Sequence, residues 1–358
     1  SPHTAKASRP GASRAAIARS TTTAPAVGRT PLQRAARSDV RTEPAHPHRS
    51  MELQPWSHHA SSGFTLRGLH SPPSGRPVLH FVHGNGYCGM VYAPMLQCLA
   101  AHFDLFLSDV QGHGDSDHGG RFLGWNRTAE LSLEAWNARR SVFGDVPVHA
   151  VGHSFGSVIS CLMLARAPHA FARAVLLDPV LFPPAMIGLM ALSDVVGLYG
   201  RNTLAQRARK RRHHWPDRDA ARANLHGRGM FRGWHADALQ AYVEHALRDL
   251  PGGGVELKCT PAREAEIFSS YPRRLWPALA RITTPTLVVH GRATFPFARR
   301  AILRWESSNA AVQRTELPGG HCFMQEDPER SAHAVRNFLM ADGAVLAPLP
   351  RAQPGPLR

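Results

Sequence analysis

Residues 146–157, which read VPVHAVGHSFGS, constrain the fold of this chain more than any other segment. A short apolar run ends in GHSFG at 152–156, and a run with helical spacing follows it. This order predicts a buried strand, a sharp turn and a helix, with Ser154 at the turn between Gly152 and Gly156. Side chains at the two glycine positions would collide with the strand or the helix, and the residue at the apex takes a strained backbone conformation. The segment therefore predicts an α/β fold in which the Ser154 hydroxyl projects from a strand end as a nucleophile.

Strand and helix patterns alternate on both sides of this segment. Strands are expected at an early sheet edge and then along the core, at 64–70, 77–82, 104–110, 146–151, 174–177, 284–290 and shortly before residue 316. Helices are expected between and after them, at 91–102, 128–143, 297–305 and 328–339. Alternation of this kind implies parallel strands joined by right-handed crossovers, and thus a doubly wound α/β sheet.

The pattern changes between residues 182 and 277. Helical segments rich in Arg and Trp are expected there, at 185–199, 203–213 and 236–249. A helical cap inserted between two strands of the sheet accounts for them. The expected organisation is an α/β core at 51–181 and 278–343, a helical cap at 182–277, and tails at 1–50 and 344–358.

Residues 1–50 consist mainly of Ala, Arg, Ser, Thr and Pro and contain hardly any large apolar residue. Such a segment cannot bury enough apolar surface to offset the entropy of ordering it, so we expect a disordered tail with no catalytic role. Two origins fit it: an Arg-rich organelle transit peptide, or translated sequence upstream of a start at Met51.

The composition narrows the class of protein. A chain of 358 residues with 43% hydrophobic residues can form a sizeable core. The formal net charge of +16 comes almost entirely from arginine, and attraction to nucleic acid or an anionic membrane is a minor hypothesis. Five cysteines without a CxxC pair predict neither a disulfide framework nor a zinc site. With no secretory signal and no apolar stretch long enough to cross a bilayer, a cytoplasmic protein is expected, unless the N-terminal tail is a transit peptide.

Six motifs in a fixed order resemble those of the α/β-hydrolase fold. They are HGNG at 83–86, DVQGHGDS at 109–116, GHSFG at 152–156, LLDP at 176–179, TLVVHG at 286–291 and PGGHCF at 318–323. The resemblance covers about residues 77–340. It implies an eight-stranded, mostly parallel sheet with a cap inserted between the sixth and seventh strands, a Ser/His/acid triad, and no cofactor or metal.

A serine hydroxyl is a weak nucleophile at neutral pH and needs an adjacent base. His321 is the candidate base, because it lies in a Gly-rich loop after a late strand and just before the last helix. His153 is adjacent to the serine in sequence, but its side chain should point away from the hydroxyl, so a structural role is expected. The resemblance assigns the two oxyanion donors to the backbone N–H groups of Phe155 and Asn85.

The acid is where the sequence departs from the family's pattern. In related proteins the strand that ends in His-Gly commonly continues as HGxxD. Here Thr294 occupies the position of that Asp. Asp178 ends the preceding strand and is the main candidate, although capping the first cap helix is an alternative role for it. Glu264 and Glu266, shortly before the sheet resumes, are lesser candidates.

The densest basic run is at 207–214, where a solvated cap surface is expected and nucleic-acid binding is the alternative. Taken together, the residues predict a serine hydrolase that cleaves a small-molecule carboxylic ester through an acyl-enzyme, without a specific nucleic-acid partner. Thioester, amide or carbon–carbon bond hydrolysis could use the same groups. A catalytically silent scaffold that binds a ligand or protein is the alternative from another class, and the oligomeric state is open.

Overall fold

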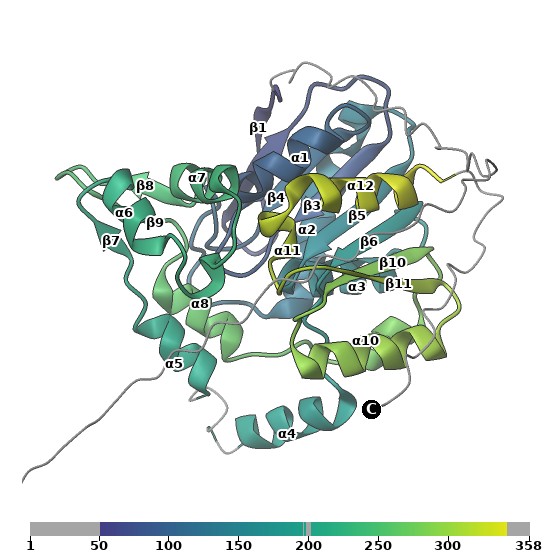
Figure 1. Ribbon diagram of the computed structural model, residues 1–358. Coiled ribbons are helices and arrows are strands. Elements are labelled where there is room, and N and C mark those ends of the chain that lie inside the picture. The colour runs from purple at the N-terminus through teal and green to yellow at the C-terminus, as the bar shows by residue number, and fades with distance from the viewer. Residues whose placement is uncertain (1–50, 196, 198–201, 342–358) are drawn as a thin grey trace, which may run out of the picture. The chain divides into compact units, whose positions relative to one another are not determined.

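The computed structural model describes residues 51–195, 197 and 202–341 (Figure 1). The expected tails at 1–50 and 344–358 lie outside the described residues. Among those described, no helix is long and apolar enough to cross a membrane.

The main sheet has eight strands in the order β1-β2-β4-β3-β5-β6-β10-β11. The pairings β1–β2 and β2–β4 are antiparallel and the other five are parallel. The strands are β1 (Gln54–His59), β2 (Thr65–His70), β3 (Val78–Val82), β4 (Asp104–Asp109), β5 (Val148–His153), β6 (Arg173–Leu177), β10 (Thr286–Gly291) and β11 (Val312–Leu317). The expected eight-stranded, mostly parallel sheet is confirmed.

The expectation that the early strand at 64–70 lies at the edge of the sheet is wrong. That strand is β2, and β1 pairs with its outer side. The sequence of β1 does not clearly predict a strand, because Trp56 is its only buried residue and four of the other five residues are polar. An edge strand faces water along one side, so it needs no regular apolar alternation.

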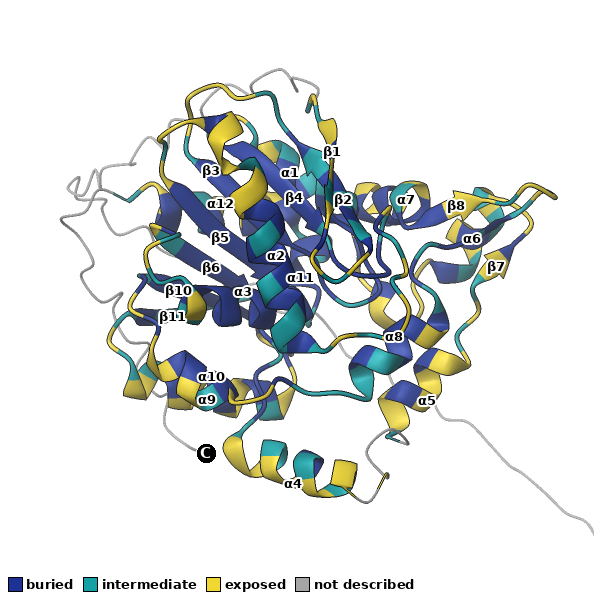
Figure 2. Ribbon diagram, turned by 180° about the vertical axis from the view of Figure 1, so that it is seen from behind, coloured by how far each residue is buried: buried dark blue, intermediate teal, exposed yellow. Residues whose placement is uncertain are grey.

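Helices cover both faces of the sheet (Figures 1 and 2). One face packs against α2 and α3 in a cluster that includes Trp136 and Trp305, and the other packs against α1 and α12 in a second cluster. The core helices are α1 (Ala93–Leu99), α2 (Trp125–Arg139), α3 (Phe155–Arg166), α10 (Pro296–Ser308), α11 (Phe323–Glu326) and α12 (Pro328–Leu339), with 3-10 turns at Gly89–Tyr92 and Arg140–Phe143. Because both faces are covered, β3 and β5 are buried along their whole length.

Between β6 and β10 the chain contains a long insert. It contains α4 (Pro184–Val195), α5 (Thr203–Arg209), α6 (Arg218–Leu225), α7 (Ala236–His245), α8 (Pro261–Phe268) and α9 (Leu275–Ala280), a 3-10 turn at Gly229–Phe231, and the strands β7 (His214–Trp215), β8 (Leu247–Asp249) and β9 (Val255–Leu257). The three strands form a small antiparallel sheet, so the insert is not purely helical as expected.

One detail of the expected insert is wrong for a local reason. The expected helix 236–249 ends at His245, because the following residues form a hairpin, β8–β9, around Pro251 and three glycines. The expected boundary at 277 falls inside α9, which packs against α3 of the core. The division of the chain into domains at these boundaries stays a prediction.

Candidate active site

Ser154 lies in the sharp turn between β5 and α3. Its backbone has φ 54° and ψ −115°, which is a strained conformation for a residue with a side chain. A Cβ on Gly152 would lie 2.5 Å from the carbonyl oxygen of Gly156, and one on Gly156 would lie 2.1 Å from that of Val82. Only glycine fits at both positions, as the sequence predicts, and the turn leaves the serine side chain partly exposed.

Ser154, His321 and Asp178 form a chain of two hydrogen bonds, with the His321 ring in the middle. The Ser154 Oγ and His321 Nε2 atoms are 2.8 Å apart, and the His321 Nδ1 and Asp178 Oδ2 atoms are 2.5 Å apart. The Asp178 carboxylate is 1% exposed, whereas the His321 side chain is 22% exposed. Because a carboxylate only accepts hydrogen bonds, Nδ1 carries the proton, and Nε2 is then free to accept the proton of the serine hydroxyl.

Asp178 follows β6 with φ 43°, and its carboxylate is held by two further donors. The backbone N–H of Gly291 donates to Oδ1 at 2.8 Å, and the Thr294 hydroxyl donates to Oδ2 at 2.7 Å. The alternative role of capping the first helix of the insert is not seen, since α4 begins only at Pro184. Thr294, at the position where the family's pattern places the acid, thus donates to the carboxylate that follows the preceding strand.

The two expected oxyanion donors lie at the start of α3 and in the loop after β3. Phe155 is the first residue of α3, where a backbone N–H has no acceptor within the helix. Asn85 follows Gly84 in the loop after β3, and its side-chain amide donates to the carbonyl oxygen of Glu264 at 3.1 Å. The next residue, Gly86, donates its N–H to His113 Nε2 at 3.0 Å. The loop at 83–86 is therefore fixed from both sides.

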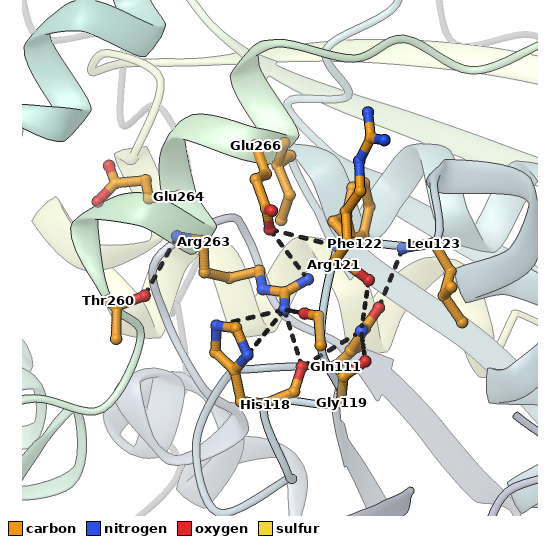
Figure 3. Close-up of polar contacts among 12 residues, drawn as sticks. Gln111, His118, Gly119, Arg121, Phe122, Leu123, Thr260, Arg263, Glu264 and Glu266 are labelled. Carbon is orange, nitrogen blue, oxygen red and sulfur yellow. Dashed lines mark hydrogen bonds and ion pairs between the residues drawn. The ribbon is translucent and has the colours of Figure 1, made fainter. Parts of the chain in front are cut away.

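Glu264 and Glu266 lie on α8 and point to different sides of it (Figure 3). The Glu264 carboxylate binds Arg211 Nη1 at 2.8 Å, and this pair is largely buried. The Glu266 carboxylate accepts the N–H of Phe122 at 3.3 Å and lies 3.3 Å from Arg263 Nη1. Their carboxylates are thus engaged with partners other than His321. The expectation that residues 207–214 form one solvated surface also fails at Arg211.

Arg263 was not singled out by the sequence, yet its side chain is fully buried and extends from α8 to His118 and Gly119 (Figure 3). Its Nη2 group donates to the carbonyl oxygens of His118 at 2.8 Å and Gly120 at 2.5 Å. The Gln111 amide donates to neighbouring carbonyls of the same loop, those of His118, Gly119 and Arg121. Arg263 therefore attaches α8 to the loop that follows β4, and Gln111 stabilises that loop from within.

Several buried histidines near the serine are held neutral. Burial lowers the pKa of His83 to about 4 and the pKa values of His113 and His153 well below the usual range. A neutral ring can donate at one nitrogen and accept at the other. These side chains therefore act as hydrogen-bonding supports, and they add no positive charge near His321.

A continuous line of aromatic rings runs from His321 to the residue after the serine. Phe295 lies 4.8 Å from the His321 ring and is 40% exposed. It stacks on Phe297, at 5.6 Å between ring centroids. The line continues through Phe182 and Trp125 to Phe155, with centroids 4.6 to 6.1 Å apart at each step. Phe295 is the exposed ring of this line and gives the surface beside His321 an apolar character, whereas Phe182, Trp125 and Phe155 belong to the buried core.

Comparisons with known proteins agree with this architecture. A curated relative, 2-(acetamidomethylene)succinate hydrolase of Mesorhizobium japonicum, is 26% identical over 272 residues, which cover 74% of this chain and 88% of the relative. The crystal structure of E-2-(acetamidomethylene)succinate hydrolase matches 80% of this chain and 99% of its own with a TM-score of 0.65 at 23% identity. The thioesterase domain of the curacin biosynthetic pathway matches 79% of this chain and 99% of its own with a TM-score of 0.62 at 17% identity. The sequence model of the Alpha/beta hydrolase family matches residues 81–334, so the chain belongs to the alpha/beta hydrolase family.

Proposed function

We propose that the protein is a serine hydrolase that cleaves carboxylic esters through an acyl-enzyme on Ser154. One observation carries the proposal: a single imidazole, that of His321, lies 2.8 Å from the Ser154 hydroxyl and 2.5 Å from a buried carboxylate. A nucleophile, a base and a group that orients the base are the parts that acyl transfer requires.

In the proposed first half-reaction, His321 Nε2 removes the hydroxyl proton as Ser154 Oγ attacks the ester carbonyl carbon. The carbonyl oxygen becomes an oxyanion, and the N–H groups of Phe155 and Asn85 donate hydrogen bonds to it. Asp178 stabilises the imidazolium without taking its proton. The imidazolium then protonates the leaving alcohol as the carbon–oxygen bond breaks, which leaves the acyl group on Ser154.

In the second half-reaction, water takes the place of the alcohol. His321 removes a proton from water, the hydroxide adds to the acyl carbonyl, and the same two N–H groups bind the oxyanion. The tetrahedral intermediate collapses, the Ser154 oxygen receives the proton back, and a carboxylic acid leaves. The exposed face of Phe295 beside His321 favours an apolar group on the substrate.

Amide hydrolysis is the second candidate, and the similarity to 2-(acetamidomethylene)succinate hydrolase favours it. That relative's name describes a substrate with an acetamido group. The same residues would serve, with the imidazolium protonating a leaving nitrogen in place of an alcohol oxygen. Thioester and carbon–carbon bond hydrolysis remain further candidates on this site, because the fold does not fix the substrate.

The test combines a fluorophosphonate probe with a panel of p-nitrophenyl esters of rising acyl length and the matching p-nitroanilides. We expect the probe to label Ser154 in the folded protein, and Ser154→Ala to lose labelling and at least about 10³-fold of turnover. Ser307→Ala, on the exposed surface of α10, is the control and should behave as wild type.

The panel separates the candidates. Faster turnover of esters than of anilides supports the ester proposal, and the reverse ranking supports the amide alternative. If folded wild-type protein is not labelled, or Ser154→Ala keeps its turnover, the hydrolase proposal is wrong and the silent-scaffold alternative gains support.

A further inference from the structure

Tyr92 and His153 form a buried hydrogen-bonded pair directly behind the serine. Tyr92 ends the 3-10 turn Gly89–Tyr92 and is fully buried, and His153, the last residue of β5, is 1% exposed. The Tyr92 Oη and His153 Nδ1 atoms are 2.6 Å apart. Neither side chain has a part in the reaction proposed above.

The pair contacts two loops at its two ends. The backbone N–H of Gly84 donates to Tyr92 Oη at 3.0 Å, and His153 Nε2 lies 3.0 Å from the carbonyl oxygen of His321. Gly84 immediately precedes Asn85, whose N–H is a proposed oxyanion donor. His321 carries the proposed base. His153 itself is bonded through the backbone to Ser154.

Donor and acceptor roles along this chain follow from chemistry. The carbonyl of His321 can only accept, so His153 Nε2 carries a proton and donates. Burial keeps the His153 ring neutral by lowering its pKa, so Nδ1 is an acceptor and the Tyr92 hydroxyl donates to it. The Tyr92 oxygen keeps its lone pairs and accepts from Gly84. The order is Gly84 N–H to Tyr92, Tyr92 to His153, and His153 to the His321 carbonyl.

The Tyr92 and His153 side chains leave no room for a side chain at position 84. A Cβ at this position would lie 2.9 Å from His153 Nδ1 and 3.2 Å from Tyr92 Oη. The absence of a side chain lets the loop backbone reach the tyrosine hydroxyl. The two side chains therefore lie between the loops, and their polar atoms form hydrogen bonds with the backbone of both.

We propose that Tyr92 and His153 are positioning residues that hold the oxyanion loop (83–86) and the base loop (318–322) at a fixed separation on either side of Ser154. This inference rests on the proposed function, because it assigns the pair a role in aligning that reaction. Displacing a reacting group by about 1 Å can cost about 100-fold in rate, so a rigid spacer between the two loops affects turnover directly.

The test for Tyr92 is the Tyr92→Phe variant, with Tyr242→Phe as the matched control. Tyr242 is fully buried in the same aromatic cluster, and its hydroxyl accepts a hydrogen bond from Arg211 Nη2 at 2.5 Å, a contact that involves neither loop. Both variants remove one buried phenolic oxygen and keep the ring. We expect Tyr92→Phe to lower kcat for a p-nitrophenyl ester about 10- to 100-fold at nearly unchanged KM, and Tyr242→Phe to change kcat less than about 3-fold.

Two variants of His153 separate the two ends of the pair. The side-chain amide of Asn reproduces the position of Nδ1, and that of Gln reproduces the position of Nε2. His153→Asn keeps the contact with Tyr92 and loses the one with the His321 carbonyl, whereas His153→Gln does the opposite. We expect His153→Asn to shift the acid limb of the kcat/KM pH profile to lower pH, because a misaligned His321 is stabilised less by Asp178 as an imidazolium.

His153→Gln should lower kcat and leave that limb where it is in wild type. Circular dichroism and a thermal melt confirm that each variant is folded, and the rate of fluorophosphonate labelling gives a second readout of alignment. Equal losses in Tyr92→Phe and Tyr242→Phe, or an unchanged acid limb in His153→Asn, would overturn the inference while the proposed function stands. An unlabelled wild-type protein would overturn both.

Discussion

At the scale of single residues, backbone strain is concentrated in the site. Among the described residues, only Ser154, Asp178 and Arg274 combine a side chain with a positive φ. Such conformations cost about 1 to 3 kcal/mol each and persist where neighbouring bonds fix them. The N–H of Ser154 donates to Leu177 at 2.9 Å and that of Asp178 donates to Val289 at 2.7 Å, so strand ends hold both residues.

The first prediction at this scale concerns the acid. Asp178→Asn should lower kcat about 10³- to 10⁴-fold, because an amide in this position no longer holds the His321 tautomer or stabilises its charge. Glu264→Gln is the control, since its carboxylate binds Arg211. Steady-state kinetics on a p-nitrophenyl ester measures both. A larger loss in Glu264→Gln than in Asp178→Asn would contradict the assignment of Asp178 as the acid.

At the scale of elements, the segments that follow two neighbouring strands meet at the carboxylate of Asp178. β6 and β10 pair in parallel with Leu177 opposite Val289, so the residues after each strand reach the same place. Asp178 follows β6, and Thr294 lies in the loop after β10 with its hydroxyl 2.7 Å from Asp178 Oδ2. A carboxylate at either position can therefore approach His321 Nδ1.

This geometry predicts that the acid can be moved. In the double variant Asp178→Asn with Thr294→Asp, the new carboxylate lies close to His321 Nδ1, while the amide introduced by Asp178→Asn can donate to it. We expect the double variant to recover at least about 10-fold of the kcat/KM that Asp178→Asn loses. Thr294→Asp alone places two carboxylates in one buried site and should lower the melting temperature. No recovery in the double variant would show that the β10 loop cannot present an acid.

α8 is the element that joins the insert to the site. Its Glu264 carbonyl accepts from the Asn85 side chain, and its Arg263 donates to the carbonyls of the loop after β4. The Arg263 Nε atom has no hydrogen-bond partner among the described residues, Nη1 lies 3.3 Å from the Glu266 carboxylate, and the guanidinium lies over the Phe122 ring at 5.8 Å. α8 thus connects the insert to the oxyanion loop through the hydrogen bond between Asn85 and Glu264.

At the scale of the whole molecule, buried histidines set the response to acid. Burial lowers the pKa of His80 to about 3 and those of His83 and His149 to about 4. The unfolded chain binds protons at these sites near pH 6.5, so stability falls as the pH drops from about 6.5 towards 4. Each histidine with a folded pKa of about 4 costs roughly 3 kcal/mol at pH 4 or below.

Asp109 acts in the opposite direction. Burial raises its pKa to about 6, so the folded protein keeps a proton that the unfolded chain releases above pH 3.8. That contribution favours the folded state at low pH and is lost as the pH rises through 6. One carboxyl group opposes several histidines, so the net stability still falls on acidification.

We therefore predict that the free energy of unfolding decreases steadily from pH 7 to pH 4.5. Urea unfolding at several pH values measures it. His149→Gln should reduce the slope between pH 6.5 and 4.5 by nearly one proton, whereas the exposed His169→Gln should leave the slope unchanged. Equal slopes in the two variants would mean that His149 does not carry the effect.

The sequence by itself determined the features that depend on neighbouring residues. The strand, turn and helix around Ser154 follow from an apolar run, two glycines and a helical spacing, all within residues 146–164. The alternation of strands and helices predicted the parallel sheet for the same reason, because hydrophobic periodicity is a local property. The edge strand β1 and the hairpin β8–β9 were not predicted, since neither has an extended apolar pattern.

Only the tertiary structure decided which groups meet. Asp178 and Thr294 are 116 positions apart, and their contact depends on the register between β6 and β10. Tyr92 and His153 are 61 positions apart and lie in segments whose residue types suit an ordinary core. Long-range contacts of this kind depend on how strands pair and how loops fold over the sheet edge. The contact between Asp178 and His321, for which the sequence left three candidates, and the bonds of Tyr92 and His153 to Gly84 and His321 therefore emerge only when the chain is folded.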